Sequence, residues 1–158
     1  PLGTPYKNLT VGIPKEIFPN EKRVAITPEN VKLLLKKGFQ SVKVEEGAGI
    51  RAQFTDAQYI AAGATITTHA DVLSTSNIVL KVRAPQDTGG QVRGEHELDL
   101  IRPGTVVISF LHPAQNGEII RAMSERGLTA FAMDQIPRIS RAQVFDALRW
   151  VCGEGGEY

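Results

Sequence analysis

Three polar side chains near the end of the sequence could bind a ligand together. Arg138, Gln143 and Asp146 follow an apolar, strand-like run at residues 128–133 and the proline that comes after it. In open α/β sheets, ligands bind in the crevice outside the carboxyl ends of the strands, so these side chains are candidate ligand contacts. A guanidinium suits a phosphate, and a carboxylate suits ribose hydroxyls. The alternative is structural: Arg138 pairs with Asp146, and Gln143 caps a turn.

Basic side chains follow three other strand-like runs. Arg23 lies in the connection after the first run, Lys81 and Arg83 end a buried apolar run, and His112 follows another. Because the carboxyl ends of parallel strands meet at one edge of a sheet, these four side chains are expected to form a basic site for a small anion. His112 is the one group among them whose ordinary titration range is near neutral pH. The alternative is that residues 15–23 form a solvated charged loop and that His112 packs beside the next residue, a proline.

A glycine-rich stretch resembles a dinucleotide-binding pattern only loosely. Gly47, Gly49 and Ala52 follow a strand-like run and match G-x-G-x-x-A. The pattern needs a helix that opens on the glycines and an acidic residue at the end of the next strand. No long helical pattern follows here, and Thr68 and His69 follow the next strand. We therefore expect a glycine-rich turn and no pyrophosphate cradle.

The elements that must position these side chains alternate between strand and helix patterns. Apolar, β-rich runs predict strands at residues 9–14, 41–45, 64–67, 77–82, 105–110 and 128–133. Helical spacing, capping residues and terminal glycines predict helices at residues 28–37, 55–62, 71–74, 95–101, 118–126 and 141–150. This alternation implies right-handed β-α-β crossovers. We predict an α/β, doubly wound fold: a mostly parallel sheet with helices on both faces, as in Rossmann-like and flavodoxin-like domains.

Length and composition restrict the class of protein. The 158 residues, 42% of them hydrophobic, suffice for one α/β domain at residues 9–150, between an N-terminal extension at 1–8 and a tail at 151–158. A net charge of +1 gives no electrostatic footprint for nucleic acid. The single cysteine, Cys152, favours a reducing compartment and offers no paired metal-binding pattern. No apolar run approaches the ~20 residues of a membrane helix, so we expect no direct membrane insertion.

Several stretches resemble a known family. They are VGIPKEIFPNEKRVAITPENV (11–31), EEGAG (45–49), AAGA (61–64), LKVRAP (80–85), SFLHPAQN (109–116) and AMDQIPRISRAQVFDAL (132–148). Together they resemble the N-terminal part of domain I of proton-translocating NAD(P) transhydrogenase. Alanine dehydrogenase shares this half of the fold and resembles the chain less closely, since it carries Lys where Arg83 stands. IFPNEKRVA resembles the mitochondrial branch of the transhydrogenases.

The resemblance implies hydride transfer between NAD(H) on domain I and NADP(H) on a separate domain, coupled to proton passage through a membrane domain. By similarity, Arg138 and Asp146 contact NAD(H), and Gln143 is the catalytic residue that bridges toward the NADP(H) nicotinamide. By comparison with alanine dehydrogenase, Arg23, Arg83 and His112 lie in its substrate pocket. A transhydrogenase has no amino-acid substrate to use them, so their role stays open.

The resemblance also implies partners. In the family this segment leads into a second half with the true glycine-rich loop, and then to membrane helices. We therefore expect the chain alone to bind NAD very weakly and to be inactive without the remaining transhydrogenase domains, in an oligomer on the matrix side of the mitochondrial inner membrane. A bacterial cytoplasm is the alternative location. Because residues 149–158 depart from the family pattern, a truncated, non-catalytic relative that serves as a structural or interaction subunit of a larger mitochondrial complex is the alternative function.

Overall fold

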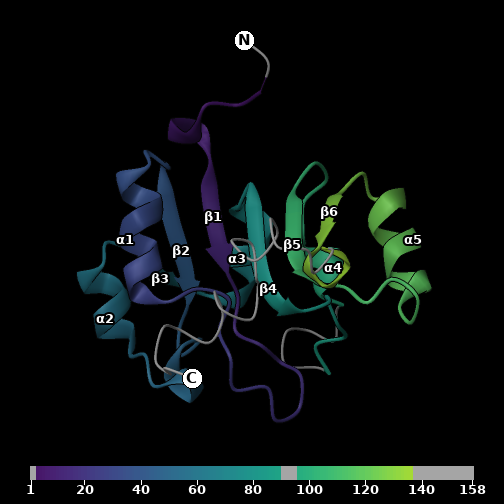
Figure 1. Cartoon of the computed structure of the whole chain (residues 1–158), viewed down its shortest axis with the longest axis horizontal. Helices are drawn as coiled ribbons and strands as arrows, with labels where there is room; N and C mark the ends of the chain where they lie inside the picture. The colour runs from purple at the N-terminus through teal and green to yellow at the C-terminus, as the bar shows by residue number, and fades with distance from the viewer. Residues whose placement is uncertain (1–2, 90–95, 137–158) are drawn as a thin grey trace.

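A six-stranded parallel sheet forms the centre of the chain (Figure 1). The computed structural model describes residues 3–89 and 96–136. Its strands are β1 (Thr10–Ile13), β2 (Ser41–Glu45), β3 (Thr65–Thr67), β4 (Ile78–Arg83), β5 (Val106–Phe110) and β6 (Thr129–Ala132). All neighbouring pairs are parallel, in the order β3-β2-β1-β4-β5-β6. This is the strand order of a Rossmann-type doubly wound sheet, which confirms the predicted fold class.

Helices connect the strands as the sequence pattern predicts. They are α1 (Pro28–Lys36), α2 (Asp56–Ala61), α3 (His69–Thr75), α4 (Glu97–Leu100) and α5 (Gly117–Glu125), with 3₁₀ turns η1 (Tyr6–Asn8), η2 (Ile50–Ala52) and η3 (Met133–Gln135). A threonine side chain caps α1, α2 and α3 by accepting a backbone N–H of the first turn. The cap from Thr68 explains why α3 begins at residue 69, earlier than the predicted 71. The helix predicted at 141–150 lies outside the described residues.

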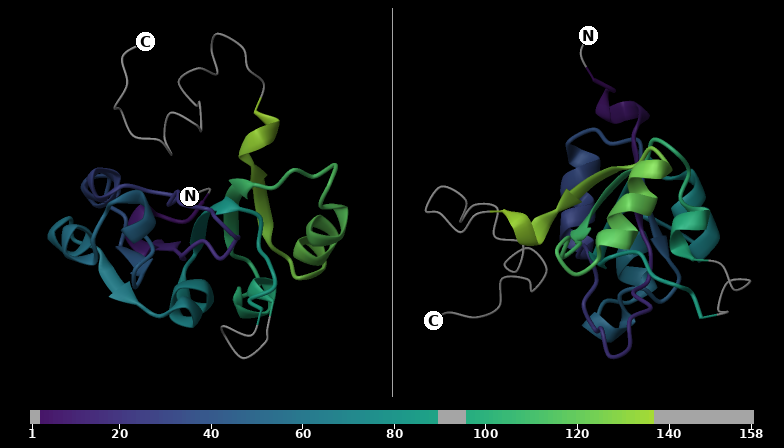
Figure 2. Two further views of the ribbon diagram at one scale, coloured as in Figure 1. Left: turned by 90° about the horizontal axis from the view of Figure 1, so that it is seen from below. Right: turned by 90° about the vertical axis from the view of Figure 1, so that its right-hand side faces the viewer.

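The first two helices of the chain cover one face of the sheet, and the last three described helices cover the other. Helices α1 and α2 pack on one face, where Val31, Tyr59 and Val44 belong to one buried apolar cluster. Helices α3, α4 and α5 contribute Leu73, Leu98 and Met123 to a second cluster. Figure 2 shows the sheet between these two groups of helices. Two apolar cores therefore fix the sheet from both sides and hold the strand ends in place.

One glycine allows a helix to approach the central strand closely. A Cβ on Gly12 of β1 would lie 2.8 Å from the Ser76 Cβ and 3.0 Å from the Val72 carbonyl oxygen. Real Cβ atoms do not approach other heavy atoms within 3.0 Å, so only glycine fits at this position against α3.

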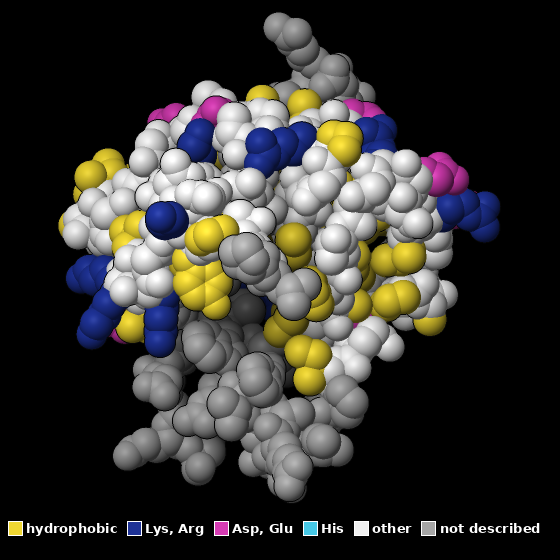
Figure 3. Space-filling view, turned by 90° about the horizontal axis from the view of Figure 1, so that it is seen from above, with side chains coloured by type: hydrophobic (Ala, Val, Ile, Leu, Met, Phe, Trp, Pro, Cys, Tyr) yellow, Lys and Arg dark blue, Asp and Glu magenta, His cyan; other side chains and the backbone are white. Residues whose placement is uncertain are grey.

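The strand order creates a switch point between β1 and β4. The connection after β1 leads through α1 toward β2, and the connection after β4 leads through α4 toward β5, on the other side of the sheet. In open α/β sheets the crevice outside the carboxyl ends of the strands at such a point is the usual ligand site. The opposite edge, where the strands begin, is seen in Figure 3; its Lys and Arg side chains lie in separate places around the rim with apolar side chains between them.

Candidate functional site

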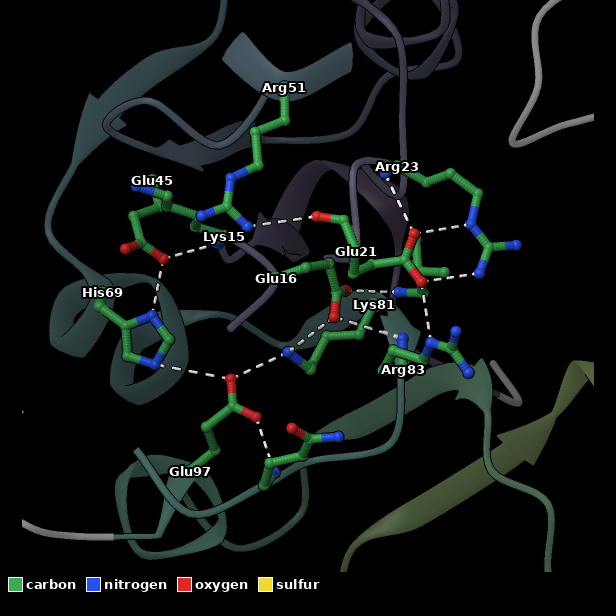
Figure 4. Close-up of polar contacts among 12 residues, drawn as sticks. Lys15, Glu16, Glu21, Arg23, Glu45, Arg51, His69, Lys81, Arg83 and Glu97 are labelled. Carbon is green, nitrogen blue, oxygen red and sulfur yellow. Dashed lines mark hydrogen bonds and ion pairs between the residues drawn. The ribbon is translucent and has the colours of Figure 1, made fainter. Parts of the chain in front are cut away.

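A carboxylate joins two arginines at the switch point (Figure 4). Glu21 lies in the connection after β1, and its Oε1 and Oε2 accept hydrogen bonds from the Arg23 Nε and Nη2 at 2.8 and 2.7 Å. The Arg83 Nε, at the end of β4, donates to the same Oε2 at 2.8 Å. The hydrogen-bonded Arg23 guanidinium, together with Arg83, lowers the pKa of Glu21 to about 2 against the opposing effect of burial. An ionised carboxylate therefore bridges both cations at neutral pH.

Arg83 is held on two sides. Its Nε is fixed by Glu21, and its Cζ lies 4.8 Å from the centre of the Phe18 ring, within the range of a cation–π contact. Among the described residues its two terminal nitrogens form no hydrogen bond or ion pair, and 36% of the side chain is exposed. The guanidinium therefore has a fixed orientation and donors available for an anion, as a carboxylate-binding or phosphate-binding arginine requires.

Lys81 does not line this basic site. Its side chain is 1% exposed, and its Nζ lies 2.9 Å from Glu97 Oε1 and 3.5 Å from Glu16 Oε2. Burial by itself lowers the pKa of Lys81, but the two carboxylates outweigh it, so that the pKa lies above the usual value. Burial raises the pKa of Glu16, against the attraction of Lys81. The amine is thus the centre of a buried ion cluster and not a ligand contact.

The buried ion cluster continues to the first turn of α3. His69 Nδ1 lies 2.6 Å from Glu45 Oε2, and its Nε2 lies 3.5 Å from Glu97 Oε1 without a hydrogen bond. Glu45 also accepts the backbone N–H of Lys15 at 2.6 Å. These contacts join the ends of β1, β2 and β4 to the starts of α3 and α4, so the floor of the crevice is built from charged groups (Figure 4).

His112 pairs with Asp134 of η3. It has a φ of 47°, its Nδ1 is 3.7 Å from Asp134 Oδ2, and 46% of its side chain is exposed. The backbone N–H groups of Leu111 and His112 both donate to Asp134 Oδ1. Burial would raise the pKa of Asp134, but hydrogen bonds from Gln135 and from these backbone N–H groups lower it overall. The structure therefore brings Arg23 and Arg83 together and pairs His112 with Asp134.

The glycine-rich stretch forms a turn, as predicted. Gly47 has a φ of 71°, and its N–H donates to both carboxylate oxygens of Asp56, at 3.0 and 3.1 Å. The three-residue turn η2 follows directly, and α2 begins only at Asp56. The donor that a phosphate would need is thus taken by an internal carboxylate, which confirms the prediction of a turn.

A surface hollow lies at the loop that carries Glu21. Its volume is about 300 Å³, and Asn20, Lys22 and Arg51 line it within the described part of the chain. The Arg51 Nη1 donates to the Glu21 carbonyl oxygen at 3.4 Å, near the limit for a hydrogen bond. Two cations, Lys22 and Arg51, therefore line this hollow.

Several of these groups could not be assigned from the sequence. Glu16 and Glu21 are buried, so the alternative of a fully solvated loop at residues 15–23 is wrong for them, although Lys22 is exposed. Glu97 was expected only as part of a helix, yet it is fully buried. Arg138, Gln143 and Asp146 lie outside the described residues.

Within residues 3–89 and 96–136, no group of three or more His, Cys, Asp or Glu side chains could hold a metal ion. No helix in the same part of the chain is long and apolar enough to cross a membrane.

The chain is similar to two kinds of oxidoreductase. A family model described as alanine dehydrogenase/PNT, N-terminal domain, matches residues 12–153. The NAD(P) transhydrogenase subunit alpha of Cereibacter sphaeroides is 43% identical over 141 residues, which are 89% of this chain and 25% of that protein. A transhydrogenase crystal structure from Sinorhizobium meliloti is 45% identical with a TM-score of 0.78, over 88% of this chain and 39% of that one. An L-alanine dehydrogenase structure is 31% identical with a TM-score of 0.72, over 84% of this chain and 35% of that one.

These relatives are much longer than the part that this chain matches. The matched part makes up 25%, 39% and 35% of these three proteins, so the chain spans well under half the length of each relative. The family model covers the sheet from residue 12 in β1 onward, helices α1 to α5 and the switch-point cluster. The chain belongs to the alanine dehydrogenase/PNT N-terminal domain family.

Proposed function

We propose that this chain is the N-terminal half of the NAD(H)-binding domain of a proton-translocating NAD(P) transhydrogenase. It takes part in hydride transfer between NADH and NADP together with the other domains of that enzyme, and it is inactive alone. The observation that carries this proposal is the 43% identity with a transhydrogenase subunit alpha over 89% of the chain. The L-alanine dehydrogenase structure shares only 31% over a similar length.

The proposed cofactor contacts follow β6. Arg138 and Asp146 contact NAD(H), and Gln143 bridges toward the NADP(H) nicotinamide. The position of β6 supports this assignment, because its carboxyl end lies at the same edge of the parallel sheet as the Glu21 cluster. Hydride transfer needs two nicotinamides held face to face, so the contacts act only when the remaining domains supply the second site.

The proposed setting follows from the same relationship. The partners are the remaining transhydrogenase domains, in an oligomer, with this domain on the matrix side of the mitochondrial inner membrane. A bacterial cytoplasm is the second location, which the bacterial transhydrogenases of Cereibacter sphaeroides and Sinorhizobium meliloti support.

The test is hydride transfer from NADH to a NADP analogue by the full protein. We expect Arg138→Ala and Asp146→Asn to weaken NADH binding at least about tenfold, as loss of a charged contact implies. We expect Gln143→Asn to slow transfer while NADH binding, followed by fluorescence, changes little. Lys32→Ala on the exposed side of α1 is the control and should leave both unchanged. Transfer by residues 1–158 alone at a rate above background would contradict the proposal.

A second candidate function is the binding of a small carboxylate at Arg23 and Arg83; His112, the third residue predicted for this pocket, pairs with Asp134 instead. The observation that favours it is the fixed Arg83 guanidinium, whose terminal nitrogens have no partner within the described residues. Because Glu21 already bridges both arginines, a ligand must use the outer side of Arg83 or displace Glu21. Pyruvate at 100 times its dissociation constant should raise the stability of the chain by about 2.7 kcal/mol. A thermal unfolding curve that pyruvate does not shift would exclude this function.

A further inference from the structure

The hydrogen-bond register of β4 changes just before Arg83. Leu80 pairs with Ile108, and Arg83 pairs with Phe110, so two residues of β4 lie opposite one residue of β5. These two residues, Lys81 and Val82, are both buried, which breaks the alternation of the strand. An extra residue of this kind is a β-bulge, and bulges redirect the side chains that follow them. The direction of Arg83 therefore depends on what holds the bulge.

The Glu16 carboxylate holds this bulge. Its Oε1 accepts the Val82 N–H at 2.6 Å, and its Oε2 accepts the Arg83 N–H at 3.3 Å. Strand β1 pairs with β4 only through Ile78 and Val79, so Glu16, which follows β1, takes the place of a strand neighbour for the two later N–H groups. A hydrogen bond from a backbone N–H to a carboxylate is about twice as strong as one between neutral groups.

Lys81 holds the Glu16 side chain in place through a buried ion pair. The Lys81 Nζ is 3.5 Å from Glu16 Oε2, and the Glu16 side chain is 3% exposed. Glu97, which binds the same amine, also accepts the N–H of Gln86 at 2.8 Å and so fixes the backbone on the far side of the bulge. The bulge is thus held by two carboxylates that share one buried lysine (Figure 4).

We propose that Glu16 is a positioning residue for the anion site: it holds the Lys81–Val82 bulge and thereby aims the Arg83 guanidinium at Glu21 and Phe18. Arg83 then presents its terminal nitrogens to a carboxylate or phosphate group at the switch point. The functional meaning of this positioning rests on the second candidate function above. The positioning itself is a property of the free chain and can be measured without a ligand.

The experiment is nuclear magnetic resonance on the ¹⁵N-labelled chain, comparing the wild type with Glu16→Gln. We expect the Arg83 Nε–Hε signal to move toward the position of a solvated arginine, and the Val82 amide to exchange about ten to a hundred times faster. Glu45→Gln is the control, because Glu45, whose side chain is 15% exposed, also accepts a backbone N–H but forms no direct hydrogen bond or ion pair with β4 within the described residues. It should leave both signals in place. An unchanged Arg83 signal in Glu16→Gln, or an equal change in Glu45→Gln, would overturn the proposal.

A second measurement covers the case in which Glu16→Gln does not fold. In the wild type, the Val82 amide should exchange as slowly as the Val79 amide, because Glu16 accepts the Val82 N–H and Val79 lies within the strand ladder. Fast exchange at Val82 beside slow exchange at Val79 would overturn the proposal. Pyruvate binding is a separate readout: if pyruvate leaves the Arg83 signal of the wild type unmoved, the second candidate function fails while the positioning result stands.

Discussion

Glu21 Oε2 and Arg83 Nε lie 2.8 Å apart although 62 positions separate the two residues in the sequence. The contact closes the switch point between β1 and β4, because Glu21 follows one strand and Arg83 ends the other. The strand order brings the two segments together. In the proposal above, the bulge in β4 then turns Arg83 toward the loop.

The first prediction concerns the acid stability that Glu21 provides. Its pKa is about 2 in the folded chain and 4.5 in the unfolded reference, so its contribution is present above pH 4.5 and is lost as the pH falls toward 2. The pKa shift corresponds to a contribution on the order of 3 kcal/mol to the free energy of unfolding. Solvent screening reduces this contribution, because both arginines are about a third exposed. Glu21→Gln should flatten the fall in unfolding free energy across this range, measured by urea unfolding at successive pH values.

A control separates this effect from general acid unfolding. Glu29 is an exposed residue in the first turn of α1. Glu29→Gln should keep the wild-type slope between pH 4.5 and 2. A Glu21→Gln curve that runs parallel to the Glu29→Gln curve would show that Glu21 is not a strongly paired carboxylate.

The second prediction concerns the buried lysine. Lys81→Met should lower the free energy of unfolding by about 3–5 kcal/mol, because it leaves Glu16 and Glu97 buried without their common cation. Lys43→Met, at a partly exposed lysine that pairs with Asp71, should cost about 1 kcal/mol or less. Equal losses in the two variants, measured by denaturant unfolding at pH 7, would be incompatible with the buried ion cluster.

The third prediction concerns Gly12. Gly12→Ala should cost about 1–3 kcal/mol, because the new Cβ would meet Ser76 and the Val72 carbonyl oxygen and would push α3 away from β1. Gly117→Ala, at the start of α5, meets nothing within 4 Å and should be neutral or stabilising. Thermal unfolding of both variants is the measurement, and a neutral Gly12→Ala would mean that this close approach is absent.

Much of the fold could be predicted from local signals. The strand at 41–45 was predicted with its observed bounds, since Val42 and Val44 alternate with polar residues. Helix α2 was expected from Thr55 and Gly63, which cap its two ends. The short turns η1 and η3 were not expected, because single 3₁₀ turns have no periodic apolar pattern.

The candidate site could be predicted only in part. The convergence of Arg23 and Arg83 follows from the strand-end rule, which needs only a parallel sheet. The strand-end rule does not predict that Glu16, Lys81 and Glu97 are buried. Their burial depends on three charges from separate segments that neutralise one another. A charged residue inside an apolar strand pattern, as Lys81 is, was the one sequence signal that a buried partner must exist.

The most direct test of the central claim is the removal of this polypeptide from its native source with an antibody. The measured quantity is hydride transfer from NADH to a NADP analogue before and after depletion. If the chain is the N-terminal half of the NAD(H)-binding domain of a transhydrogenase, depletion should remove that activity in proportion to the polypeptide removed. Full activity after complete depletion would contradict the account and would favour a non-catalytic subunit.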